Sequence, residues 1–132
     1  MRVVALDYGA ARCGVAVSDP TGTLATPLDP VLRPASKRGF ARLVALIEEL
    51  QAERVVVGLP LSLSGGDSAQ TRETRAFAAR LAEAIAVPVE LYDERFTTSL
   101  AAQTGGTASL DSRAAATLLD EWLHLPMKGG TD

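Results

Sequence analysis

The order of short β-branched runs and helical stretches is the feature that most limits how this chain can fold. Three predicted strands come first, at residues 2–6, 13–17 and 23–31. The connections between them are too short for the crossover that parallel pairing requires, so these strands should pair antiparallel. Pro27 and Pro30 lack the backbone N–H that a central strand needs, which favours an edge position for the third strand. The chain therefore begins with an antiparallel meander.

After the meander, helical and extended segments alternate. Ser36 is a suitable N-cap for a helix over residues 37–50, where the apolar side chains recur at helical spacing. Residues 54–58 form a continuous apolar run, which is typical of a strand buried on both faces of a parallel sheet. The remaining predicted elements are a helix capped by Ser68, a strand at residues 87–92, a short helical stretch from Thr98 to Gly105, and a last helix that opens near Asp111 and ends at Pro126.

This order predicts an α/β protein with a five-stranded mixed sheet, in which three antiparallel strands are followed by βα units and helices cover both faces. It is the chain order of the RNase H-like fold, although the periodicities alone also allow other mixed α/β sandwiches. A length of 132 residues suits one domain. We expect a single domain over residues 1–126 and a flexible C-terminal tail over residues 127–132.

Composition favours a cytoplasmic protein. No apolar run approaches the roughly 20 residues that span a bilayer, so no membrane partner is expected. The first apolar run ends at Asp7, too early for a signal peptide. The single cysteine, Cys13, cannot form an internal disulfide, which fits a reducing compartment.

The net charge of −3 does not suggest a dedicated nucleic-acid binder, because neutralising phosphates requires Lys and Arg. The charges are unevenly distributed. Residues 1–42 carry six basic and three acidic side chains, whereas the remaining residues carry seven and thirteen. An acidic surplus suits a protein that gathers divalent cations, and it is also what an ordinary solvated surface looks like.

Three carboxylates occupy the ends of predicted elements: Asp7 and Glu94 follow strands, and Asp111 opens the last helix. In open α/β sheets, sites form where strands end. Two carboxylates about 4 Å apart repel each other by roughly 4 kcal/mol at an effective dielectric of 20. Mg²⁺ or Mn²⁺, which prefer oxygen ligands, would relieve that repulsion. Each residue also has a purely structural interpretation: Asp7 could close a turn, Glu94 could belong to a solvated charge cluster, and Asp111 could be an N-cap.

Four segments carry a family resemblance that covers nearly the whole chain. They read DYGAARCGVAVSD at residues 7–19, GLPL at residues 58–61 with two glycines shortly after, DERFTT at residues 93–98, and DSRAAATLLDEWL at residues 111–123. In this order they resemble the signatures of the YqgF/RuvX family, which is RuvC-like within the RNase H-like superfamily. Members of that family are described as Holliday junction resolvases and as nucleases that mature the 5′ end of pre-16S rRNA.

The resemblance implies a metal-dependent endonuclease acting on structured nucleic acid. Asp7, Glu94 and Asp111 would be the catalytic residues and would hold two Mg²⁺ or Mn²⁺ ions. The partner would be an rRNA precursor or branched DNA, contacted by nucleic-acid-binding residues for which Arg12, Arg72 and Arg95 are the candidates. Symmetric cutting of a junction would require a homodimer.

Two departures from the family pattern keep other interpretations open. Ala11 stands where the first motif usually has Lys, and residues 99–110 contain no Lys or Arg, whereas this segment is longer and basic in typical relatives. The alternative is a nucleic-acid or ribosome-assembly binding module with weak or lost nuclease activity. A phosphotransferase is a third interpretation, because Asp-Tyr-Gly in a hairpin is similar to the phosphate loop of actin-like kinases. Those enzymes close two domains around ATP, and this chain has the length of one.

Overall fold

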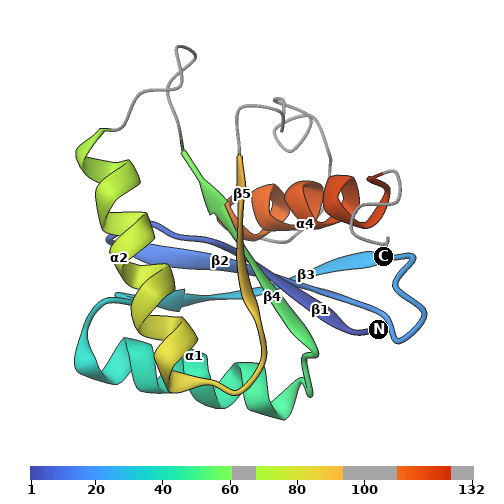
Figure 1. Cartoon of the computed structure of the whole chain (residues 1–132), viewed down its shortest axis with the longest axis horizontal. Coiled ribbons are helices and arrows are strands. Elements are labelled where there is room, and N and C mark those ends of the chain that lie inside the picture. Colours follow the sequence, from blue (N-terminus) through green and yellow to red (C-terminus); the bar gives the residue numbers. More distant parts are fainter. Residues whose placement is uncertain (61–67, 94–109, 126–132) are drawn as a thin grey trace.

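The computed structural model describes residues 1–60, 68–93 and 110–125 of the chain (Figure 1). The described elements are β1 (Val3–Asp7), β2 (Arg12–Ser18), β3 (Ala25–Leu32), α1 (Lys37–Glu49), β4 (Arg54–Leu59), α2 (Ala69–Ala84), β5 (Val89–Asp93) and α4 (Leu110–Leu123). The helical stretch predicted at residues 98–105 and the predicted tail at residues 127–132 lie outside the described residues. No helix in the described part of the chain is long and apolar enough to cross a membrane.

All five strands form one mixed sheet in the order β3-β2-β1-β4-β5. β2 pairs antiparallel with both β1 and β3, whereas β4 runs parallel to β1 and to β5. The predicted meander followed by βα units is therefore confirmed. β3, which contains Pro27 and Pro30, is an edge strand as expected.

Helices cover both faces of the sheet, as predicted (Figure 1). One hydrophobic core cluster joins the sheet to α1 and α2, and a second, smaller cluster joins the opposite face to α4. Alternate residues of β1 enter the two cores: Val4 and Leu6 pack toward α1 and α2, and Val3 and Ala5 pack toward α4. This alternation decides which way the side chains after Leu6 point.

The helix caps follow the sequence prediction closely. The Ser36 hydroxyl accepts a hydrogen bond from the Gly39 amide at 3.0 Å, and the Ser68 hydroxyl accepts one from the Thr71 amide at 3.2 Å. The last helix differs in one respect. It begins at Leu110, so Asp111 lies within its first turn and is not the cap residue.

Candidate functional site

The parallel strands β1, β4 and β5 end at one edge of the sheet, and Asp7 is the last residue of β1. By the alternation of β1, Asp7 continues the series that faces α4, and Tyr8 joins the core under α2. Across the β1–β2 ladder, Asp7 is paired with Gly14. The carboxylate thus belongs to the same face of the sheet as the helix that carries Asp111.

Gly14 is the point at which α4 approaches the sheet. A Cβ atom on Gly14 would fall against the backbone carbonyl of Asp111 and would lie 2.8 Å from the backbone nitrogen of Ser112. No residue other than glycine fits this approach without displacement. The first turn of α4 therefore rests directly on β2, so that Asp7 and Asp111, from opposite ends of the sequence, flank the same glycine.

A buried hydrogen bond holds this turn in place. The Val15 amide donates to the Ser112 hydroxyl at 3.2 Å, at an irregularity in the pairing of β2 with β3. Ser112 is fully buried. Because an unpaired buried amide costs about 1–3 kcal/mol, the Ser112 hydroxyl fixes the position of its neighbour Asp111.

In the described part of the chain, two carboxylates and one guanidinium lie near Gly14. Arg12 Nη1 lies 3.8 Å from Asp111 Oδ2, and both side chains are partly exposed, so this pair contributes little to stability. Burial raises the pKa of the Cys13 thiol, and the nearby negative charges of Asp7 and Asp111 raise it further. Cys13 is thus a protonated core residue and not a nucleophile.

The third predicted carboxylate follows β5. Glu90 and Tyr92 of that strand contact α4: the Trp122 indole N–H donates to Glu90 Oε2 at 3.0 Å, and the Tyr92 hydroxyl bonds to Glu121 Oε1 at 3.4 Å. β5 ends at Asp93. Glu94 and Arg95 come next in the sequence and lie outside the described residues.

The structure brings together Asp7, Asp111 and Arg12 from the predicted site residues. Arg72 is exposed on α2, which begins after the end of β4 but covers the sheet face opposite α4. Among the described residues, no group of three or more His, Cys, Asp or Glu side chains could hold a metal ion. The chemistry of the two described carboxylates nevertheless fits Mg²⁺ or Mn²⁺, because both ions prefer oxygen ligands.

The roles of Gly14 and Ser112 in positioning the site are not evident from the sequence. Their roles depend on a close approach between β2 and α4, which are far apart in the sequence. No local pattern signals such a contact. The sequence shows the glycine in the first motif, but it does not show the backbone of α4 that lies against it.

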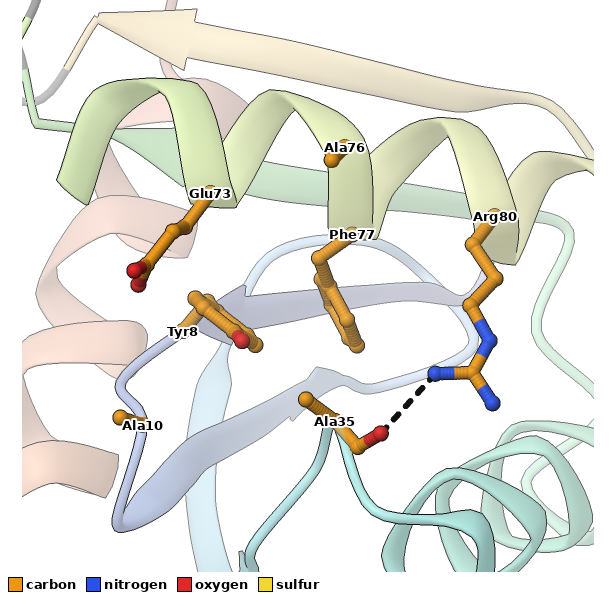
Figure 2. Close-up of a pocket in the computed structure, with 7 residues that line it drawn as sticks. All are labelled: Tyr8, Ala10, Ala35, Glu73, Ala76, Phe77 and Arg80. Atoms are coloured by element: carbon orange, nitrogen blue, oxygen red, sulfur yellow. Dashed lines mark hydrogen bonds between the residues drawn. The ribbon is translucent and has the colours of Figure 1, made fainter. Parts of the chain in front are cut away.

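A cavity of about 440 Å³ lies on the other side of the β1–β2 hairpin, between that hairpin and α2 (Figure 2). Its floor is aromatic, with Tyr8 and Phe77 stacked at 4.4 Å between ring centroids. Arg80 at one end donates to the Ala35 carbonyl at 3.0 Å, and Glu73 lies at the other end (Figure 2). Burial raises the pKa of Tyr8, and the charge of Glu73 raises it further, so its hydroxyl stays protonated at neutral pH. The stacked Tyr8 and Phe77 rings beneath the cavity therefore pack the hairpin that carries Asp7 against α2.

Comparison with known proteins decides the family. The family model described as "RuvX: Holliday junction resolvase" matches residues 1–125. The chain belongs to the RuvX family. A Mycobacteroides abscessus relative is 39% identical, with the alignment covering 99% of this chain and 86% of that protein. A Koribacter versatilis relative is 48% identical, with the alignment covering 73% of this chain and 63% of that protein. Both relatives are named "Putative pre-16S rRNA nuclease".

Solved structures agree with this membership at the level of the fold. Thermus thermophilus RuvC in complex with a Holliday junction substrate matches this RuvX chain with a TM-score of 0.63 at 16% identity, covering 94% of both chains. A second structure of Thermus thermophilus RuvC matches with a TM-score of 0.58 at 19% identity. The expected RNase H-like fold is confirmed by this likeness.

Proposed function

We propose that this RuvX-family protein is a metal-dependent endonuclease that hydrolyses phosphodiester bonds in structured nucleic acid. One observation carries the proposal: Asp7 and Asp111 flank Gly14 at the edge where the parallel strands end. The family description, the names of the relatives and the RuvC-like fold support nucleic acid as the substrate. By analogy with the relatives, the substrates to test are an rRNA precursor and a four-way DNA junction.

In this proposal Asp7, Glu94 and Asp111 are the catalytic residues and the ligands of two Mg²⁺ or Mn²⁺ ions. Glu94 is included because it directly follows β5 in the sequence, lies in the DERFTT segment that resembles the second family motif, and comes after a strand whose Glu90 and Tyr92 contact α4. When bound, such ions supply an activated water and neutralise the charge on the leaving oxygen. Carboxylates are suitable ligands for both ions because they provide negatively charged oxygens.

The other residues of the site act on position and on the substrate's charge. Gly14 and the Val15–Ser112 hydrogen bond fix the backbone of Asp111 relative to β1. Arg12, beside Asp111, presents a planar guanidinium that can bind a phosphate oxygen of the strand to be cut. Arg72, on α2, remains a proposed contact to the substrate, and so does Arg95, which follows Glu94 in the sequence.

Cleavage of three substrates by the purified protein tests the proposal: an rRNA precursor, a four-way DNA junction and a linear duplex, each with Mg²⁺, Mn²⁺ or EDTA. We expect cleavage of a structured substrate in the presence of metal and none in EDTA. Undiminished cleavage in EDTA would contradict the metal-dependent mechanism. Binding without cleavage under every metal condition would favour the binding-module interpretation instead.

A further inference from the structure

A basic surface lies where β3 turns into α1, next to the β2 segment that carries Arg12. Arg33, Lys37, Arg38 and Arg42 are all exposed there. A groove of about 780 Å³ runs along this surface, lined by Arg33, Arg38 and Arg42 together with Pro30 and Leu32 of the edge strand. Asp29 is the one acidic residue among those described as lining it. We call this surface the β3–α1 groove.

The local backbone holds the three arginines together. Arg33 adopts a left-handed conformation, with φ of 47°, and its carbonyl accepts a hydrogen bond from the Ser36 hydroxyl at 2.7 Å. A Cβ atom on Gly39 would collide with the carbonyls of Leu32 and Arg33, so α1 packs directly against this turn. Arg38 and Arg42, which are four residues apart and thus neighbours on the helix surface, are thereby brought beside Arg33.

The cations of the groove are not held in ion pairs by the rest of the described chain. No ion pair within the described residues involves Arg33, Lys37, Arg38 or Arg42. The first turn of α1 contains no acidic residue. This concentration of unpaired cations contrasts with a net charge of −3 for the whole chain. Clustered positive charges repel one another, and an anionic partner that binds across them relieves this repulsion.

The groove adjoins the strand that carries Arg12 of the candidate site. Arg12, which lies 3.8 Å from Asp111, is paired with Leu32 across the β2–β3 ladder. The Arg33 amide donates to the Ala11 carbonyl at 2.9 Å. The backbone of Arg12, whose side chain lies beside Asp111, is therefore adjacent to the backbone of Leu32 and Arg33, which line the groove with the two arginines of α1.

We propose that the β3–α1 groove binds the sugar-phosphate backbone of one arm of the nucleic acid that is cut at Asp7 and Asp111. This inference rests on the proposed function, and it assigns the grip on substrate to residues 33–42. The occupant is a polynucleotide and not a small nucleotide, because the cations extend from the candidate site along a groove. It also accounts for how a chain without Lys or Arg in residues 99–110 can hold a polyanion.

Binding in EDTA tests the groove separately from the chemistry. Fluorescence anisotropy would measure the affinity of wild type and of Arg38→Gln/Arg42→Gln for a DNA junction, a DNA duplex and an RNA hairpin over a range of salt concentrations. We expect the double variant to bind at least tenfold more weakly at 0.1 M salt. The slope of log K against log salt should fall by about two for duplex DNA, close to 0.9 for each lost phosphate contact.

The matched control is Arg2→Gln/Arg54→Gln, which removes the same charge at the opposite end of the strands, where β1 and β4 begin. Arg2 bonds to the Leu50 carbonyl and Arg54 pairs with Glu90, so thermal melts should accompany both double variants. We expect the folded control to keep the wild-type salt slope. Wild-type affinity and slope in the groove variant, or an equal loss in the control, would overturn the inference.

The two proposals fail in different ways. If wild type cleaves with metal while the groove variant binds like wild type, the groove inference falls and the proposed function stands. If the groove variant loses binding while wild type never cleaves with any metal, the groove stands and the nuclease proposal falls. Comparison of the DNA and RNA probes then shows which polynucleotide the groove prefers.

Discussion

Replacing Gly14 with alanine tests the close approach of α4 to the sheet. The added methyl group would lie 2.8 Å from the Ser112 nitrogen and would also meet the Asp111 carbonyl. Because ordinary contacts to a Cβ atom begin at 3.4 Å, the Ser112 nitrogen alone would have to retreat by about 0.6 Å, and the Asp111 carbonyl, which is closer still, by more. The backbone cannot yield as a flexible side chain would. We therefore expect Gly14→Ala to be destabilising even though it sits in a strand, where alanine is otherwise the better residue.

The expected loss of stability combines three effects. Overpacking costs about 1–3 kcal/mol. Weakening the buried Val15–Ser112 hydrogen bond adds about 1–3 kcal/mol. The lower conformational entropy of the unfolded alanine variant stabilises the folded state by about 0.4–1 kcal/mol in the opposite direction. The net expectation is a loss of about 3 kcal/mol in the free energy of unfolding, which corresponds to a fall of about 10 °C in Tm for a domain of this size.

Urea unfolding and cleavage kinetics would measure the two consequences of Gly14→Ala. On the proposed function, moving Asp111 relative to Asp7 should lower the single-turnover rate by about 100-fold, since a shift near 1 Å can cost that much. Ser112→Ala is the companion variant, because it removes the hydrogen bond and leaves the approach of α4 unobstructed. A Gly14→Ala protein that unfolds within 0.5 kcal/mol of wild type would refute the packing argument.

Two further predictions concern side chains on the two faces of the sheet. Phe77→Ala should lower the free energy of unfolding by about 3–5 kcal/mol in urea titrations, because it removes a buried ring stacked on Tyr8. A loss below about 1 kcal/mol would show that this contact is not part of the core. Burial raises the pKa of Glu121 in the folded state, so its carboxylate opposes folding once the pH rises above its ordinary pKa. Glu121→Gln should therefore stabilise the protein at pH 7 and have little effect near pH 3. Thermal melts at the two pH values would measure this difference. A stabilisation that grows as the pH falls would contradict the expected pH dependence.

Much of the fold follows from local sequence signals. The β-branched runs specify the strands, and Ser36 and Ser68 cap their helices as predicted. The continuous run of Val55 to Val57 indicates a strand buried on both faces, and β4 lies between two parallel neighbours. Pro27 and Pro30 mark the edge strand because neither can donate to a ladder. These features are local, so the sequence alone is enough to predict them.

The candidate site was only partly predictable. Asp7 and Asp111 were identifiable because element termini and family motifs both point to them. Their common neighbour Gly14 was not, because its role depends on the position of α4 in space. The β3–α1 groove also escaped prediction, although residues 1–42 had a visible basic surplus. Its arginines converge through a left-handed turn at Arg33 and the packing of Gly39, and neither has a local sequence signature.

The central claim is that Asp7 and Asp111 hold a catalytic metal. The Mn²⁺ dependence of the free energy of unfolding tests this claim most directly. Wild type, Asp7→Asn and Asp120→Asn would be unfolded in urea at increasing Mn²⁺; Asp120 is an exposed carboxylate near the far end of α4 and serves as the control. At 100 times the Kd, a ligand that binds the folded state alone stabilises it by about 2.7 kcal/mol. We predict that wild type and Asp120→Asn gain this stability and that Asp7→Asn gains little. An equal gain in Asp7→Asn, or no gain in wild type, would contradict the assignment.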